Sequence, residues 1–73
     1  MIQPIPDKKR YQVFMDHARP GCFEFVSDFP SEKEAEAHAV HTQATYSRVD
    51  VVVLDALTET LCLTLTGKRT LTG

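Results

Sequence analysis

Apolar and polar residues alternate in the stretch that begins at Tyr11. Tyr11, Val13 and Met15 fall on one side of this alternation, and Gln12 falls on the other. A period of two residues predicts a strand with one buried face. Phe14 is apolar but lies on the polar side of the pattern. We therefore predict that Phe14 faces water, where an aromatic side chain is a candidate anchor for a partner.

A turn and a second strand follow. Pro20 and Gly21 suit the two central positions of a type II turn, because proline presets the first and glycine supplies the positive φ of the second. In the next segment, CFEFVSDF, Phe23 and Phe25 fall on one face and Val26 on the other. The two stretches together predict a β-hairpin.

A helix is predicted to begin at Ser31. Ser31 and Glu34 form the S-x-x-E pattern of a capping box, in which the serine side chain accepts from the backbone N–H three residues later. Alanine-rich sequence of high helix propensity then carries the helix to Gln43 or Ala44.

Two apolar stripes run along this helix, Ala35, Ala39 and Thr42 on one side and Ala37, Val40 and Ala44 on the other. We predict that the first stripe is buried, because Ala35 lies one turn after the cap. Ala37 and Val40 would then form a mild apolar surface, either ordinary exposed residues or a contact patch.

Two further strands complete the pattern. RVDVVVLD places Val49, Val51 and Val53 on one face, and TLCLTL alternates Leu61, Leu63 and Leu65 with Thr60, Cys62 and Thr64. The valine, leucine and aromatic stripes are predicted to face the helix. Water-facing positions are predicted at Arg48, Asp50, Thr60, Cys62 and Thr64.

The order of elements predicts an α+β domain of β-β-α-β-β type, a four-stranded antiparallel sheet with one helix packed on one face. Residues 11–66 form the domain, residues 1–10 an extended arm and residues 67–73 a C-terminal tail. Each hairpin makes its two strands neighbours, whereas the full strand order stays open.

Composition narrows the classes of function. The 73 residues are 42% apolar and 25% charged, with a formal net charge of −2. An acidic balance disfavours direct nucleic-acid binding, which depends on Lys and Arg contacts to phosphates. We find no apolar run of transmembrane length and no signal-peptide core, so the sequence predicts a cytoplasmic protein without membrane contact. Cys22 and Cys62 would stay as thiols there.

Candidate chemistry is sparse. Glu34, His38 and His41 fall on one arc of the predicted helix, and this spacing permits a metal site or a pH-responsive contact. The HExxH motif is absent, and Glu34 is engaged by its capping role, so a solvated helix flank is the simpler interpretation. His17 and Cys22 are the only nucleophile and base close in sequence, and isolated glycines make no phosphate loop. The sequence predicts no catalytic residue and no cofactor.

One overall pattern is familiar: YQV in the first strand, FPSEKEAEAHA opening the helix and YSRVDVV before the third strand. It resembles the very small β-β-α-β-β proteins of bacterial and phage genomes, many of which act by binding a larger protein. In length and pattern the chain is also similar to the class of RNA-polymerase-binding transcription regulators known from a lytic Xanthomonas phage. The resemblance implies a phage-encoded, non-enzymatic regulator that binds host RNA polymerase in the bacterial cytoplasm and inhibits transcription or promotes antitermination.

We therefore expect a protein-binding module that inhibits or redirects a host complex. The candidate partner-binding residues are Lys8, Lys9, Arg10, Phe14, Ala37 and Val40. There are two alternatives. One is an anti-CRISPR-type inhibitor of another host complex, and the other is a metal- or pH-responsive domain that uses His38 and His41. The oligomeric state stays open, because exposed edge strands permit dimerisation.

Overall fold

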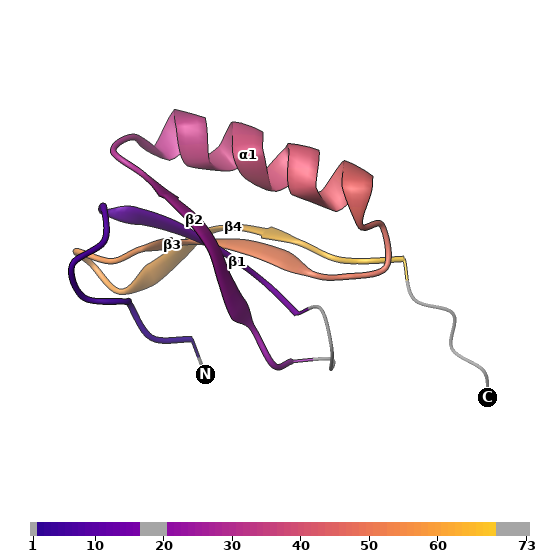
Figure 1. The fold of residues 1–73 in the computed structure, drawn as a ribbon, viewed down its shortest axis with the longest axis horizontal. Coiled ribbons are helices and arrows are strands. Elements are labelled where there is room, and N and C mark those ends of the chain that lie inside the picture. The colour runs from indigo at the N-terminus through magenta and orange to yellow at the C-terminus, as the bar shows by residue number, and fades with distance from the viewer. Residues whose placement is uncertain (1, 17–20, 69–73) are drawn as a thin grey trace.

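The structure, a computed structural model, describes residues 2–16 and 21–68 (Figure 1). Its elements are β1 (Tyr11–Met15), β2 (Glu24–Phe29), α1 (Glu32–Thr45), β3 (Val51–Asp55) and β4 (Thr60–Leu65). The four strands form one antiparallel sheet in the order β2-β1-β3-β4. The predicted α+β fold and its order of elements are confirmed, and the structure adds that β1 and β3 are the central strands.

The helix begins as the sequence predicts. Ser31 is the N-cap, and its Oγ accepts from the backbone N–H of Glu34 at 3.3 Å. The same hydroxyl donates to the Glu34 carboxylate at 3.0 Å, so the glutamate is held by the Ser31 side chain. This cap satisfies one of the four N–H groups that every helix leaves without an intrahelical partner.

The face of the sheet under α1, here called the helix face, carries the main core. Its fully or nearly buried residues are Val13, Ala35, Ala39, Val49, Val51 and Val53. The predicted buried stripe of the helix is confirmed, since Ala35 and Ala39 are 0% exposed and Thr42 is 5% exposed. Small side chains let the helix lie close to a sheet of β-branched residues.

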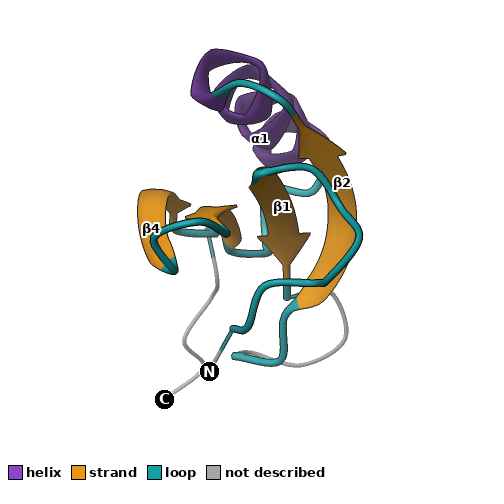
Figure 2. Cartoon of the chain, turned by 90° about the vertical axis from the view of Figure 1, so that its left-hand side faces the viewer, coloured by secondary structure: helices purple, strands orange, loops and turns teal. Residues whose placement is uncertain are grey.

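The opposite face, here called the arm face, is also apolar. Phe14, Val52 and Leu54 are buried there, and Ile2 and Ile5 of the N-terminal arm pack against them. In Figure 2 the helix lies on one side of the sheet and the arm on the other. The prediction that Phe14 faces water is wrong: only 3% of Phe14 is exposed, because a chain segment outside the sheet covers this face.

A bulge in each hairpin places residues of one predicted apolar stripe on two different faces of the sheet. In the first hairpin the register shifts between Val13 and Phe14, so Phe25 pairs with Phe14 and Val26 is the extra residue. Phe23 and Phe25 therefore join the arm face, while Val26 packs on the helix face. The prediction that the aromatic stripe faces the helix is wrong for Phe23 and Phe25, because one inserted residue reverses the alternation.

The second bulge has the same effect on β4. Val53 pairs with Leu63 and Leu54 with Leu61, which leaves Cys62 as the extra residue. Leu63 and Cys62 pack on the helix face, whereas Leu61 lies opposite Leu54 of the arm face. The predictions that Leu61 faces the helix and Cys62 faces water are therefore wrong.

The loop before β3 is tied to the end of β4. Asp50 is half-buried; its N–H donates to the Asp16 carboxylate at 2.6 Å, and its own carboxylate accepts from Gly67 at 2.6 Å. Asp50 is thus not the water-facing residue that the alternation predicts. Arg48, Thr60 and Thr64 are exposed as predicted.

Two remaining predictions concern chain segments outside the strands. The predicted turn at residues 17–21 lies outside the described residues except for Gly21, whose φ is +81°. Of the predicted tail, residues 69–73 lie outside them as well. In the part of the chain that the structure describes, no helix is long and apolar enough to cross a membrane.

Candidate functional site

One hollow at the described surface lies on the arm face. It is a groove of about 650 Å³, here called the arm groove. Five apolar side chains line it: Ile2, Pro4, Phe23, Leu54 and Leu61. Gln3, Gly21 and Glu59 also line it, so Glu59 is the one charged residue among the described residues of the lining. The volume falls within the range of pockets that accept a ligand or a partner side chain.

Gln12 holds in place the arm that forms one side of this groove. Its side chain is 0% exposed, and its Oε1 accepts from the Ile5 N–H at 2.8 Å. Its Nε2 donates to the Ile5 carbonyl at 3.0 Å and to the Lys9 carbonyl at 3.1 Å. A buried carboxamide must satisfy its hydrogen bonds, and here it does so on the arm backbone. Ile2 and Pro4 are thereby held beside β3 and β4.

An ion pair fixes the other end of the arm. Arg10 donates to both carboxylate oxygens of Asp55, from Nε at 2.8 Å and from Nη2 at 2.9 Å. Hydrogen bonding by Arg10 lowers the pKa of Asp55 to about 2, and the N–H of Leu57 adds to this effect against the opposing influence of burial. The Asp55 side chain is 9% exposed, so the pair anchors the arm to the end of β3.

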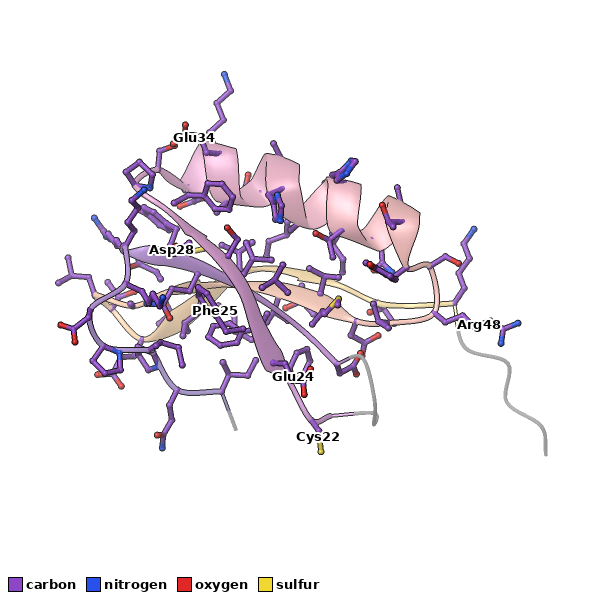
Figure 3. All side chains as sticks on the ribbon, viewed as in Figure 1. Cys22, Glu24, Phe25, Asp28, Glu34 and Arg48 are labelled. Carbon is purple, nitrogen blue, oxygen red and sulfur yellow. The ribbon has the colours of Figure 1, made fainter. Side chains whose placement is uncertain are left out.

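The three basic residues of the arm, which the sequence predicts as partner contacts, are partly engaged within the domain. Arg10 is occupied by Asp55, and the Lys8 ammonium lies 5.2 Å from the centre of the Phe25 ring. Lys9 is exposed, while its backbone N–H donates to Asp28 at 2.6 Å. Figure 3 labels Phe25 and Asp28, both on β2. The arm is thus attached to both β2 and β3.

The second predicted contact patch lies far from this groove. Val40 is 56% exposed and Ala37 is exposed, as the helical wheel predicts. Both are exposed residues of α1, and α1 covers the helix face, whereas the arm packs on the other face of the sheet (Figure 2). The structure therefore does not bring Phe14, the basic arm and the Ala37/Val40 patch together as one surface.

The predicted metal candidates do not form a ligand set. Glu34 is held by Ser31, and the His38 ring contacts the ring of Phe29 in a tilted arrangement, with ring centres 5.1 Å apart. The rings of His38 and His41 are 6.5 Å apart. Within residues 2–16 and 21–68, no group of three or more His, Cys, Asp or Glu side chains is placed to hold a metal ion. Their arrangement resembles a partly solvated helix flank.

Two cysteines and one pair of acidic residues are the other groups that could carry chemistry. Cys22 is an exposed thiol (Figure 3), and Cys62 is half-buried under α1. Burial raises the pKa of the Cys62 thiol, and the nearby Glu32 adds to the effect. Burial also raises the pKa of Glu36, with a further contribution from its hydrogen bond to Glu32. A raised thiol pKa works against nucleophilic chemistry at Cys62. His17 lies outside the described residues.

Comparison with known proteins adds no assignment, since no family model, curated protein or solved structure matches the chain. The arm groove was missed by the sequence pattern because its lining comes from the arm, the hairpin turn and two strands. A signal was nevertheless present in the sequence. Ile2 and Ile5 are apolar residues in a predicted extended arm, and Phe14 is an apolar residue on a predicted polar face. Contact between them would account for both departures from the pattern.

Proposed function

We propose that this chain is a non-enzymatic protein-binding module that receives an apolar side chain of a larger protein in the arm groove. The observation that carries the proposal is the lining of that groove, where five apolar residues and one carboxylate surround about 650 Å³. Apolar hollows of this kind accept the aromatic or aliphatic anchors that dominate binding energy at protein interfaces.

The exposure of the lining supports the same role. Leu61 is 49% exposed although it lies beside the buried Leu54, so part of the apolar surface is accessible to a partner. Closing the groove over an apolar side chain would remove this surface from water, which is favourable in proportion to its area. Glu59 gives the groove a negative charge, and we expect a basic residue next to the partner's apolar anchor.

The chemistry of the groove supports binding over catalysis. General acid–base or nucleophilic catalysis needs at least two reactive groups in contact, a nucleophile or base and a group that orients it. Among the described residues of the lining, Glu59 is the one ionisable side chain. We therefore assign the groove to recognition.

We further propose bacterial RNA polymerase as the first partner to test, on the strength of the sequence resemblance. Binding would inhibit or redirect transcription in the host cytoplasm. The same groove would serve an anti-CRISPR-type inhibitor equally well, so an unbiased capture should precede the targeted experiment. Lys8 and Lys9 on the arm supply positive charge that would steer the approach of an acidic partner surface.

The experiment is affinity capture from bacterial lysate with three tagged proteins. The wild type identifies the bound complex, Leu61→Glu puts a charge into the groove, and Val40→Glu puts the same charge on the outer side of α1. Both positions are about half exposed, at 49% and 56%, so neither substitution should unfold the domain. Loss of the captured complex with Leu61→Glu and its retention with Val40→Glu would support the proposal.

A second control separates the groove from its surroundings. Leu57 is 73% exposed in the turn between β3 and β4 and is not part of the lining. Leu57→Glu should retain the complex. Two results would overturn the assignment of binding to the arm groove. One is equal capture of the complex by Leu61→Glu, Val40→Glu and Leu57→Glu, and the other is loss of the complex with Val40→Glu alone.

A further inference from the structure

The outer edge of β4 is a second surface that the fold leaves for a partner. β4 stands at the end of the sheet order and, within residues 2–16 and 21–68, pairs with β3 alone. Figure 2 shows no described segment along its outer side. Backbone N–H and C=O groups on such an edge are a template for pairing with another strand. We propose that β4 pairs antiparallel with β4 of a second copy of this chain, which makes one continuous sheet.

The two edges of the sheet differ in their protection. β2, the other edge strand, carries Glu24 and Asp28 and is followed by Pro30. An antiparallel pair of β2 strands about Val26 would set Glu24 opposite Asp28 of the second copy, and like charges directly opposite each other are destabilising. Charge and proline are among the features that block edge pairing, as are bulges, which β2 and β4 both carry. β2 is thus protected.

β4 shares the bulge but lacks the charge and the proline. From Thr60 to Thr66 the chain holds no charged residue and no proline. Side chains of Thr and Leu at these positions favour a pleated strand. The less protected edge is therefore the one suited to association.

Charges at the ends of β4 favour a second copy in antiparallel orientation. Glu59 precedes the strand and Lys68 follows it, and both are exposed. In an antiparallel pair, the Lys68 end of one strand lies beside the Glu59 end of the other. Two-fold symmetry produces this contact at both ends of the pair. A parallel copy would instead place like charges together. The end charges thus select the orientation that two-fold symmetry produces.

The hydrogen-bonded ladder between β3 and β4 also indicates the register in which the two β4 strands would pair. Pairing is regular from Leu63 to Leu65, while the bulge lies at Cys62. A two-fold axis at Thr64 uses this regular half. It sets Thr64 opposite Thr64 of the second copy and Leu63 opposite Leu65. Thr–Thr and apolar cross-strand pairs are both favourable.

This geometry has a consequence for the arm groove. A two-fold axis perpendicular to the sheet keeps both helices on one face and both grooves on the other. A dimer would thus present two grooves toward one partner surface, and linked sites of this kind bind more tightly than one. The association itself does not depend on the proposed function, because the strands pair through main-chain groups of β4, although Glu59 belongs to both surfaces.

The test measures the mass of the full chain by light scattering over a range of concentrations. We expect a mass approaching twice the 8.2 kDa of one chain as concentration rises. Thr64→Lys and Thr64→Glu each set like charges across the axis and should weaken dimerisation by roughly tenfold. An equimolar mixture of the two variants should restore the dimer, since Lys then faces Glu.

Two controls keep the result specific. Leu57→Lys adds the same charge at an exposed position on the same hairpin and should dimerise like the wild type, and circular dichroism should show all variants folded. Amide hydrogen exchange should show β4, and not β2, gaining protection with concentration. The proposal is overturned by a wild-type mass of one chain up to about 1 mM. Undiminished dimerisation of Thr64→Lys, or protection of α1 in place of β4, would overturn it as well.

Discussion

Gln12 and Ile5 exchange two hydrogen bonds, one from the Ile5 N–H to the Gln12 Oε1 and one from the Gln12 Nε2 to the Ile5 carbonyl. Through this pair a strand residue in the centre of the sheet holds a segment that the hydrophobic pattern leaves unstructured. Ile2 and Ile5 then cover part of the arm face, and the uncovered remainder is the arm groove. The proposed binding surface thus depends on a polar contact.

Replacing Gln12 should release the arm. Gln12→Leu keeps the volume but leaves the Ile5 N–H and the carbonyls of Ile5 and Lys9 without their partner, at a cost of about 1 to 3 kcal/mol in the free energy of unfolding. Urea denaturation measures this cost, and amide exchange at Ile5 should accelerate. Gln3→Leu, at an exposed glutamine of the same arm, serves as the matched control. Unchanged protection of Ile5 in Gln12→Leu would show that other contacts hold the arm.

Phe14 should behave as a core residue. It is 3% exposed and packs edge-to-face on Phe25, with ring centres 5.8 Å apart. Truncation to alanine should lower the free energy of unfolding by about 3 to 5 kcal/mol. Because small domains have only about 5 to 15 kcal/mol of total stability, Phe14→Leu should be measured beside it as the milder variant. Wild-type stability of Phe14→Ala together with lost partner binding would instead support an exposed anchor.

The ion pair between Arg10 and Asp55 should make the free energy of unfolding depend on pH in the acidic range. The pKa of Asp55 in the folded chain is about 2, below the ordinary value of about 3.9. A carboxyl group with a lowered pKa contributes stability that is fully present above about pH 4 and is lost as the pH falls toward 2. The urea midpoint of Asp55→Asn should therefore fall less than that of the wild type over this window.

The matched control for this experiment is Asp7→Asn, at an exposed aspartate of the arm. Its midpoint should follow the wild type through the same pH range. Parallel curves for Asp55→Asn and the wild type from pH 5 to pH 2 would contradict the assigned role of Asp55.

Gly67 is required where the chain leaves β4. A Cβ at this position would lie 2.6 Å from the backbone carbon of Arg48 and 2.6 Å from the carbonyl oxygen of Val49. Neither backbone atom can move aside without shifting the loop before β3, so Gly67→Ala should cost about 1 to 3 kcal/mol. Thermal unfolding measures the loss, with Thr66→Ala at the exposed neighbouring position as the control. A Gly67→Ala protein as stable as Thr66→Ala would show that this loop adjusts freely.

Much of the fold could be predicted because several local signals agree. Ser31 and Glu34 define the start of the helix, and the wheel identifies Ala35 and Ala39 as its buried side. The valines of β3 likewise fall on the face that the alternation gives them. These features depend on residues close in sequence, where propensity and periodicity are informative.

The face of several strand residues could not be predicted, because alternation assumes a regular ladder. The bulges at Val26 and Cys62 each add one residue, and every position beyond a bulge changes face. Gln12 illustrates a second limit. A polar residue in an alternating strand is read as exposed, and only the distant arm backbone makes its burial favourable. The arm groove depends on both effects, so pattern alone did not locate it.

The most direct test of the proposed role of the arm groove compares Leu61→Glu with Val40→Glu in binding to the complex that the wild type captures, beginning with purified bacterial RNA polymerase. We expect Val40→Glu to bind like the wild type and Leu61→Glu to bind at least about tenfold more weakly, a loss of about 1.4 kcal/mol or more. Wild-type affinity of Leu61→Glu, with binding lost in Val40→Glu, would contradict the proposal and assign recognition to the outer side of α1.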